Sequence, residues 1–143
     1  MDSLFSRRLK MLGMFLFLMG LITGFTTTNL KNPRMGLAAH LEGVMNGTFL
    51  IAAGLIWNDL RLLSKLKNAT YWTLIYGTFV NWLITLIAAY SGTYAMSPVT
   101  GHGFMGTPIQ ENFVNAGFIT VGLTMVFSVT VMTYGLRGGL KTA

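Results

Sequence analysis

Charged residues occur only in a few short stretches of this chain, separated by long uncharged segments. Its 143 residues include only ten Lys and Arg and four Asp and Glu, 10% in total, against roughly 25% in an average soluble domain. None occurs within residues 11–30, 68–110 or 112–136. Each of these gaps is at least as long as the roughly 20 residues with which a helix crosses a bilayer. The sequence therefore predicts an all-α integral membrane protein and argues against a soluble domain.

Four apolar segments fit this interpretation, at about 9–28, 36–57, 71–93 and 112–136. We expect a single transmembrane domain over residues 1–143, folded as a four-helix bundle in contact with membrane lipid. Lys and Arg are concentrated at the two ends of the chain and in the loop between the second and third segments. The positive-inside rule then predicts that both termini are cytoplasmic, and we expect the membrane to be a bacterial inner membrane.

The net charge of +6 does not indicate a nucleic-acid partner. The basic residues flank the apolar segments and form no basic face, which nucleic-acid binding would require. The chain has no cysteine, so disulfides, thiolate metal sites and cysteine nucleophiles are excluded.

The second apolar segment contains three polar side chains, His40, Glu42 and Asn46. An ionisable side chain at mid-bilayer costs roughly 2.5 to 3.5 kcal/mol and is a functional candidate by default, although His40 and Glu42 are close enough to the segment's start to meet headgroup water. At about 100° per residue, Glu42 and Asn46 share a helix face, and His40 points about 120° away from Asn46. An imidazole on a flat apolar surface suits axial ligation of a haem. The three side chains together also suit a proton relay or a small cation site.

Two glycine pairs have four-residue spacing, Gly20 with Gly24 and Gly43 with Gly47. Such pairs either permit close approach of two helices or leave room for a flat ligand. Gly43 and Gly47 lie on the same segment as His40, which makes them candidate cofactor contacts.

The third apolar segment presents Thr78, Asn81 and Thr85 as one polar stripe. Asn81 either forms an interhelical hydrogen bond, worth about 0.6 kcal/mol on average, or contacts a substrate. In the third loop, His102 lies between two glycines, where it is either a solvated side chain or a further ligand or lid residue. Glu111 fits the start of the fourth helix, where an acidic residue complements the helix dipole.

The run Ala39-His40-Leu-Glu42-Gly43-Val-Met-Asn46-Gly47, with a basic second loop and Asn81 in the third segment, resembles the styrene oxide isomerases and their relatives the hydroxylaminobenzene mutases. The resemblance implies a homotrimer that binds haem b, with His40 as the axial ligand of the iron and Asn46 holding the substrate oxygen near it. Counting on from His40, Asn81 matches the third-segment Asn of the family. Thr85 falls where the epoxide isomerases have an active-site Tyr, which favours the mutase branch, although Tyr76 and Tyr90 remain as other phenols on this helix.

These observations lead us to expect an isomerase that converts an aryl hydroxylamine, hydroxylaminobenzene, into 2-aminophenol. The ferric haem held by His40 is expected to act as Lewis acid on the substrate oxygen, with Gly43 and Gly47 beside it, while Asn46, Asn81 and Thr85 form the catalytic pocket for a small apolar aromatic substrate.

Three alternatives to this mutase are considered. The first is an epoxide isomerase that converts styrene oxide to phenylacetaldehyde. The second is a small proton channel or transporter lined by the polar residues of the second segment. The third is a membrane anchor of a larger redox complex, which the lack of a second well-placed histidine disfavours.

Overall fold

The computed structural model describes residues 2–137, and within them four long helices are long and apolar enough to cross a membrane. The helices and short turns follow one another as α1 (Asp2–Thr26), η1 (Thr27–Asn29), α2 (Pro33–Ile56), η2 (Trp57–Asp59), α3 (Ser64–Ser91), α4 (Pro98–Gly101) and α5 (Pro108–Gly135). The predictions of an all-helical fold and of four spanning segments are confirmed. Each long helix begins before its predicted segment and ends within two residues of the predicted end, because charged residues end an apolar run without ending a helix.

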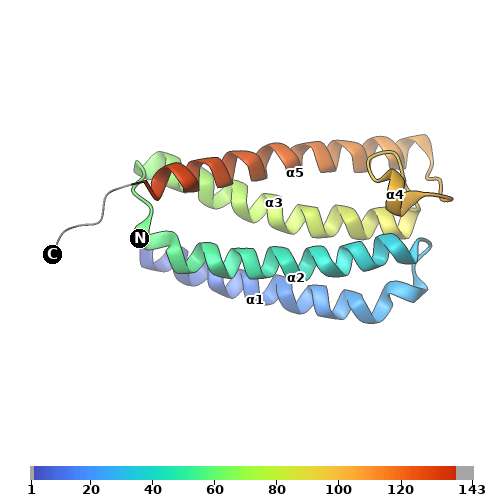
Figure 1. The fold of residues 1–143 in the computed structure, drawn as a ribbon, viewed down its shortest axis with the longest axis horizontal. Helices are drawn as coiled ribbons and strands as arrows, with labels where there is room; N and C mark the ends of the chain where they lie inside the picture. Colours follow the sequence, from blue (N-terminus) through green and yellow to red (C-terminus); the bar gives the residue numbers. More distant parts are fainter. Residues whose placement is uncertain (1, 138–143) are drawn as a thin grey trace.

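The bundle consists of two helix pairs (Figure 1). α1 packs mainly against α2, and α5 packs against α3, while contact between α2 and α3 joins the pairs. α1 begins and α5 ends at the same end of the bundle, because a chain that runs along the bundle four times returns to the end where it started. We call this the terminal end. The loop between α3 and α5, which contains α4, lies at the opposite end.

Local sequence signals set the helix boundaries at the end opposite the termini. Asn32 caps α2 by accepting a hydrogen bond from the backbone N–H of Met35 at 3.1 Å, a common role for Asn before a helix. Thr107 and Gln110 form a reciprocal capping box at the start of α5. α3 ends at Gly92, whose φ of 77° lies in the left-handed region that glycine adopts without strain.

Glycines bring α1 and α2 into close backbone contact. A Cβ atom added to Gly43 would lie 2.4 Å from Cα of Gly20, and one added to Gly13 would lie 2.6 Å from the carbonyl oxygen of Gly47. No side chain fits at these separations. Of the two explanations for the glycine spacing, close helix approach is therefore the one that this interface shows.

Two apolar clusters fill the bundle. The larger one, toward the terminal end, is built around Leu50, Trp57 and Leu74. The smaller one, toward the opposite end, includes Met35 and Ile84. On α2, the polar residues of the candidate site lie between Met35 of the smaller cluster and Leu50 of the larger one. On α3, Asn81 and Thr85 lie where the two clusters meet.

Candidate functional site

His40 is held against α1 by its ring. Its Nδ1 lies 2.8 Å from the carbonyl oxygen of Gly20, and a Cβ atom added to Gly24 would lie 2.9 Å from the same nitrogen. A carbonyl oxygen can only accept, so Nδ1 is the donor in this contact, and in the neutral ring Nε2 keeps its lone pair. The His40 ring makes no other hydrogen bond within residues 2–137. A neutral imidazole oriented in this way is the form that binds a metal through Nε2.

Glu42 connects two helices through amide groups. Its Oε2 accepts a hydrogen bond of 3.0 Å from Nδ2 of Asn46, one turn further along α2. The same oxygen accepts from Nδ2 of Asn81 on α3. Asn46 is 8% exposed. We call Glu42, Asn46 and Asn81 the amide cluster. It confirms that Glu42 and Asn46 share a helix face, and it gives Asn81 the interhelical hydrogen bond that was one of its two predicted roles.

His40 and the amide cluster face different neighbours. The imidazole contacts α1 at Gly20, whereas Glu42 reaches α3 at Asn81. No hydrogen bond within residues 2–137 links His40 to Glu42, so these two side chains form no continuous relay in this chain. No group of three or more His, Asp or Glu side chains capable of holding a metal ion occurs in the same residues. A site that needs one axial imidazole is compatible with this arrangement, because it requires no second protein ligand.

Thr85 is buried, at 3% exposure, and its hydroxyl donates to the backbone carbonyl of Asn81 at 2.8 Å. Its oxygen therefore satisfies its own helix and does not replace a phenol. The two α3 phenols considered in its place, Tyr76 and Tyr90, also lie outside the amide cluster. Tyr76 is hydrogen-bonded to Thr120 of α5 at 2.9 Å, and Tyr90 is 76% exposed.

The predicted cofactor contacts Gly43 and Gly47 face α1. A Cβ atom on Gly47 would lie 2.5 Å from the backbone nitrogen of Phe17, and Gly43 meets Gly20 as described above. Within this chain the space beside both glycines is filled by helix backbone, which leaves no slot for a flat ligand there. On α1, Gly24 packs against the His40 ring itself, which occupies the space that a Cβ atom would take.

The loop that contains His102 is fastened by the two basic residues at this end of the bundle. Arg34 donates a hydrogen bond to the backbone carbonyl of His102. Lys31 donates to the carbonyls of Ser91 at 2.8 Å and Met105 at 3.0 Å. The His102 side chain itself is exposed, which is the solvated alternative of the sequence analysis.

Glu111 lies in the first turn of α5, as predicted. Its carboxylate also accepts hydrogen bonds from the backbone N–H groups of Tyr94, Ala95 and Gly106. Glu111 therefore organises the α3–α5 loop in addition to complementing a helix start.

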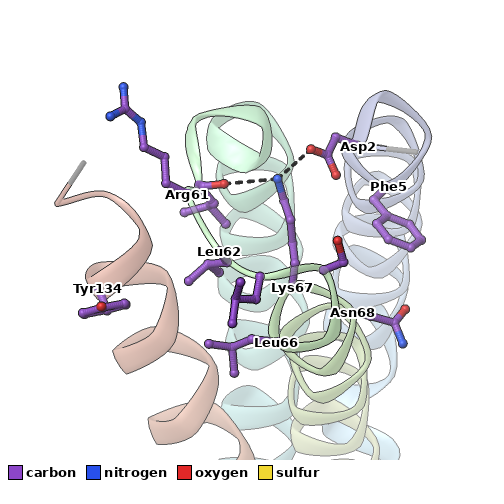
Figure 2. Close-up of a pocket in the computed structure, with 11 residues that line it drawn as sticks. Asp2, Phe5, Arg61, Leu62, Leu66, Lys67, Asn68 and Tyr134 are labelled. Atoms are coloured by element: carbon purple, nitrogen blue, oxygen red, sulfur yellow. Dashed lines mark hydrogen bonds and ion pairs between the residues drawn. The ribbon is translucent and has the colours of Figure 1, made fainter. Parts of the chain in front are cut away.

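A cavity lies at the terminal end of the bundle (Figure 2). It has a volume of about 890 Å³ and is lined by the starts of α1 and α3, the loop before α3 and the end of α5. The buried Lys67 donates to Asp2 at 2.9 Å and to the carbonyl of Leu60 at 3.2 Å. Lys67 is therefore already paired, and its ion pair with Asp2 joins the start of α1 to α3. We interpret the polar residues of this cavity as structural.

Sequence reasoning identified His40, Asn46 and Asn81 but did not predict that Glu42 joins the two amides. The signal was present in part. Glu42 and Asn46 have the i, i+4 spacing that places side chains in contact on a helix. The partner on α3 depends on how α2 and α3 are rotated against each other, and spacing within one helix carries no information about that rotation.

The fold and these contacts define a small membrane protein with a polar site between its helices. The model of the styrene oxide isomerase family matches residues 5–137, and the chain therefore belongs to this family.

Two relatives from Ectopseudomonas oleovorans are similar over most of their length. Hydroxylaminobenzene mutase HabB is 42% identical over 137 residues, covering 95% of this chain and 84% of the relative. Hydroxylaminobenzene mutase HabA is 47% identical over 103 residues, covering 71% and 76%. No solved structure matches the chain. The relatives are mutases, and the family is one of isomerases.

Proposed function

We propose that this protein is a haem-dependent membrane isomerase that converts hydroxylaminobenzene into 2-aminophenol. The substrate is suggested by the two mutase relatives. The cofactor rests on one observation: the hydrogen bond from His40 to the Gly20 carbonyl leaves Nε2 free in a partly exposed imidazole. A hydrogen bond from the other ring nitrogen orients metal-binding histidines in this way in many proteins.

The reaction is an isomerisation with no net oxidation or reduction. The N–O bond of the hydroxylamine breaks, a C–O bond forms at the adjacent ring carbon, and the proton displaced from that carbon ends on nitrogen. When bound, haem b would supply a Lewis-acidic iron for the departing oxygen. His40 is the residue that would hold it.

The chain's own residues supply orientation and exclude water. Asn46 and Asn81 offer hydrogen bonds to the polar end of the substrate, and Thr85 forms part of the wall behind Asn81. The apolar clusters on both sides of these residues keep bulk water from trapping a cationic ring. A small aromatic substrate would reach the site from the bilayer.

The proposal extends to assembly and placement. His40 and the amide cluster point toward different helices, so one protomer can ligate a haem while its amides serve another. We propose a shared site between protomers on this basis, and a homotrimer because the family resemblance implies one, in a bacterial inner membrane with both termini cytoplasmic. Native mass spectrometry of the detergent-solubilised protein tests the trimer, and a monomer that retains full haem content would contradict the shared site.

Epoxide isomerisation is the second candidate, because the family model is described as styrene oxide isomerase. The two reactions are separated by offering hydroxylaminobenzene and styrene oxide to the same purified protein. We expect 2-aminophenol from the first and little phenylacetaldehyde from the second, since Thr85 provides no phenol. The reverse preference would overturn the mutase proposal.

An absorption spectrum of the purified protein tests the cofactor independently. We expect a Soret band. A colourless protein that conducts protons in liposomes would instead support the channel alternative, in which the polar residues of α2 line a path.

A further inference from the structure

Glu42 determines which end of the Asn46 and Asn81 amides faces it. Both hydrogen bonds to Glu42 come from the NH₂ ends of the amides. Because the same Oε2 accepts both hydrogen bonds, it fixes which end of each amide faces Glu42. The carbonyl oxygens of Asn46 and Asn81 are consequently turned away from Glu42.

Those two carbonyl oxygens have no hydrogen-bond partner within residues 2–137. Neither is among the buried side-chain atoms that lack one, which are Nε1 of Trp57, Oγ1 of Thr93 and Oδ1 of Asn115. The oxygens of Asn46 and Asn81 therefore remain accessible. They come from two different helices, and one shared carboxylate orients both amides.

We propose that Glu42 is a positioning residue that makes this site selective for ligands carrying N–H or O–H donors. An aryl hydroxylamine has both donors on adjacent atoms, whereas an epoxide has only an acceptor oxygen. A ligand N–H or O–H that binds one of these carbonyl oxygens replaces the hydrogen bond from water that the oxygen loses when the ligand enters. An epoxide oxygen in the same place would cover these acceptors without pairing them, and such unpaired polar groups are the basis of strong discrimination by polar sites. The inference rests on the proposed mutase function and deepens it.

The discriminating experiment compares binding of phenol and anisole by isothermal titration. These ligands differ in that phenol has an O–H donor and anisole has a methyl group in its place. We expect the wild-type protein to prefer phenol by about tenfold, the effect of one net hydrogen bond of about 1.4 kcal/mol. Glu42→Leu removes the acceptor that orients both amides, and the preference should disappear.

Two further variants separate positioning from a general structural effect. Glu42→Gln keeps one acceptor oxygen and should retain most of the preference. Thr48→Val changes a polar residue of α2 whose hydroxyl bonds only its own helix, to the carbonyl of Val44, and should leave the preference unchanged. In an Asn46→Ala/Asn81→Ala background, Glu42→Leu should cause no further loss, because the amides it orients are already absent.

Kinetics with hydroxylaminobenzene provide the second measurement. Glu42→Leu should lower kcat/KM by about 100-fold, the scale of a misplaced reactive group, and Glu42→Gln should recover most of that loss. A wild-type protein without phenol preference, or a Glu42→Leu variant that keeps it, would overturn the inference. A protein with the preference but no conversion of hydroxylaminobenzene would instead overturn the proposed function and leave the role of Glu42 intact.

Discussion

At the scale of single residues, His40 differs from the second histidine of the chain in its surroundings. Its Nδ1 is committed to the Gly20 carbonyl, whereas the His102 side chain is exposed and only its backbone is engaged. One imidazole is therefore oriented by a neighbouring helix and the other is solvated. The sequence showed both histidines, but the carbonyl that fixes the tautomer of His40 lies on another helix and could not be inferred from spacing.

Replacing His40 by Ala should remove the Soret band and lower the mutase rate by at least about 100-fold. The reason is that no other described side chain is placed to ligate the same iron. His102→Ala is the matched control and should keep both the spectrum and the rate. Circular dichroism checks that both variants remain helical. Full haem content in His40→Ala would show that the ligand lies elsewhere.

The polar stripe of α3 contains two different kinds of residue. Asn81 bonds across to Glu42 on α2, and Thr85 bonds back to its own helix. The sequence predicted the stripe but could not distinguish these roles, because a threonine hydroxyl satisfies either its helix or a neighbour.

Asn81→Ala should therefore lower kcat/KM by about 10- to 100-fold, because it removes one of the oriented amides. Thr85→Val keeps the side-chain volume and should change kcat/KM by less than about threefold, apart from any loss of stability. Steady-state kinetics with hydroxylaminobenzene measure both. An equally large loss in Thr85→Val would give its hydroxyl a direct role in the reaction.

At the scale of elements, glycine spacing determines how α1 and α2 meet. Gly13 opposes Gly47, and Gly20 opposes Gly43, so the two helix backbones approach without side chains between them. The sequence predicted that such pairs permit either close packing or a flat ligand. The choice depends on which helix lies opposite, which is a property of the assembled bundle.

Gly13→Ala should destabilise the bundle by about 1 to 3 kcal/mol, as overpacking typically does. The added Cβ would lie 2.6 Å from the Gly47 carbonyl and 2.8 Å from the backbone nitrogen of Ile51, neither of which can move alone. Gly122→Ala is the matched control on α5, where a Cβ atom meets nothing within 4 Å. Thermal unfolding in detergent should show a lower Tm for Gly13→Ala only. Equal Tm values for the two variants would mean that this interface tolerates a wider separation.

At the scale of the whole molecule, the distribution of charge was sufficient to predict four spanning helices. The largest uncharged stretches correspond to α1, α3 and α5, and α2 was found despite Glu42 because its remaining residues are apolar. What charge could not predict is the pairing of α1 with α2 and of α3 with α5 around a central α2–α3 contact. That central contact assembles the amide cluster, so the candidate site depends on tertiary arrangement even though most of its residues were identified from the sequence.

The isomerase proposal is tested most directly by following the oxygen atom. Purified protein is incubated with hydroxylaminobenzene in ¹⁸O-labelled water, and the mass of the 2-aminophenol is measured. An intramolecular transfer in a site closed to bulk water predicts product that carries the substrate's own oxygen and no label. Extensive incorporation of ¹⁸O would show that water attacks the ring, and would contradict an isomerisation held within the helix bundle.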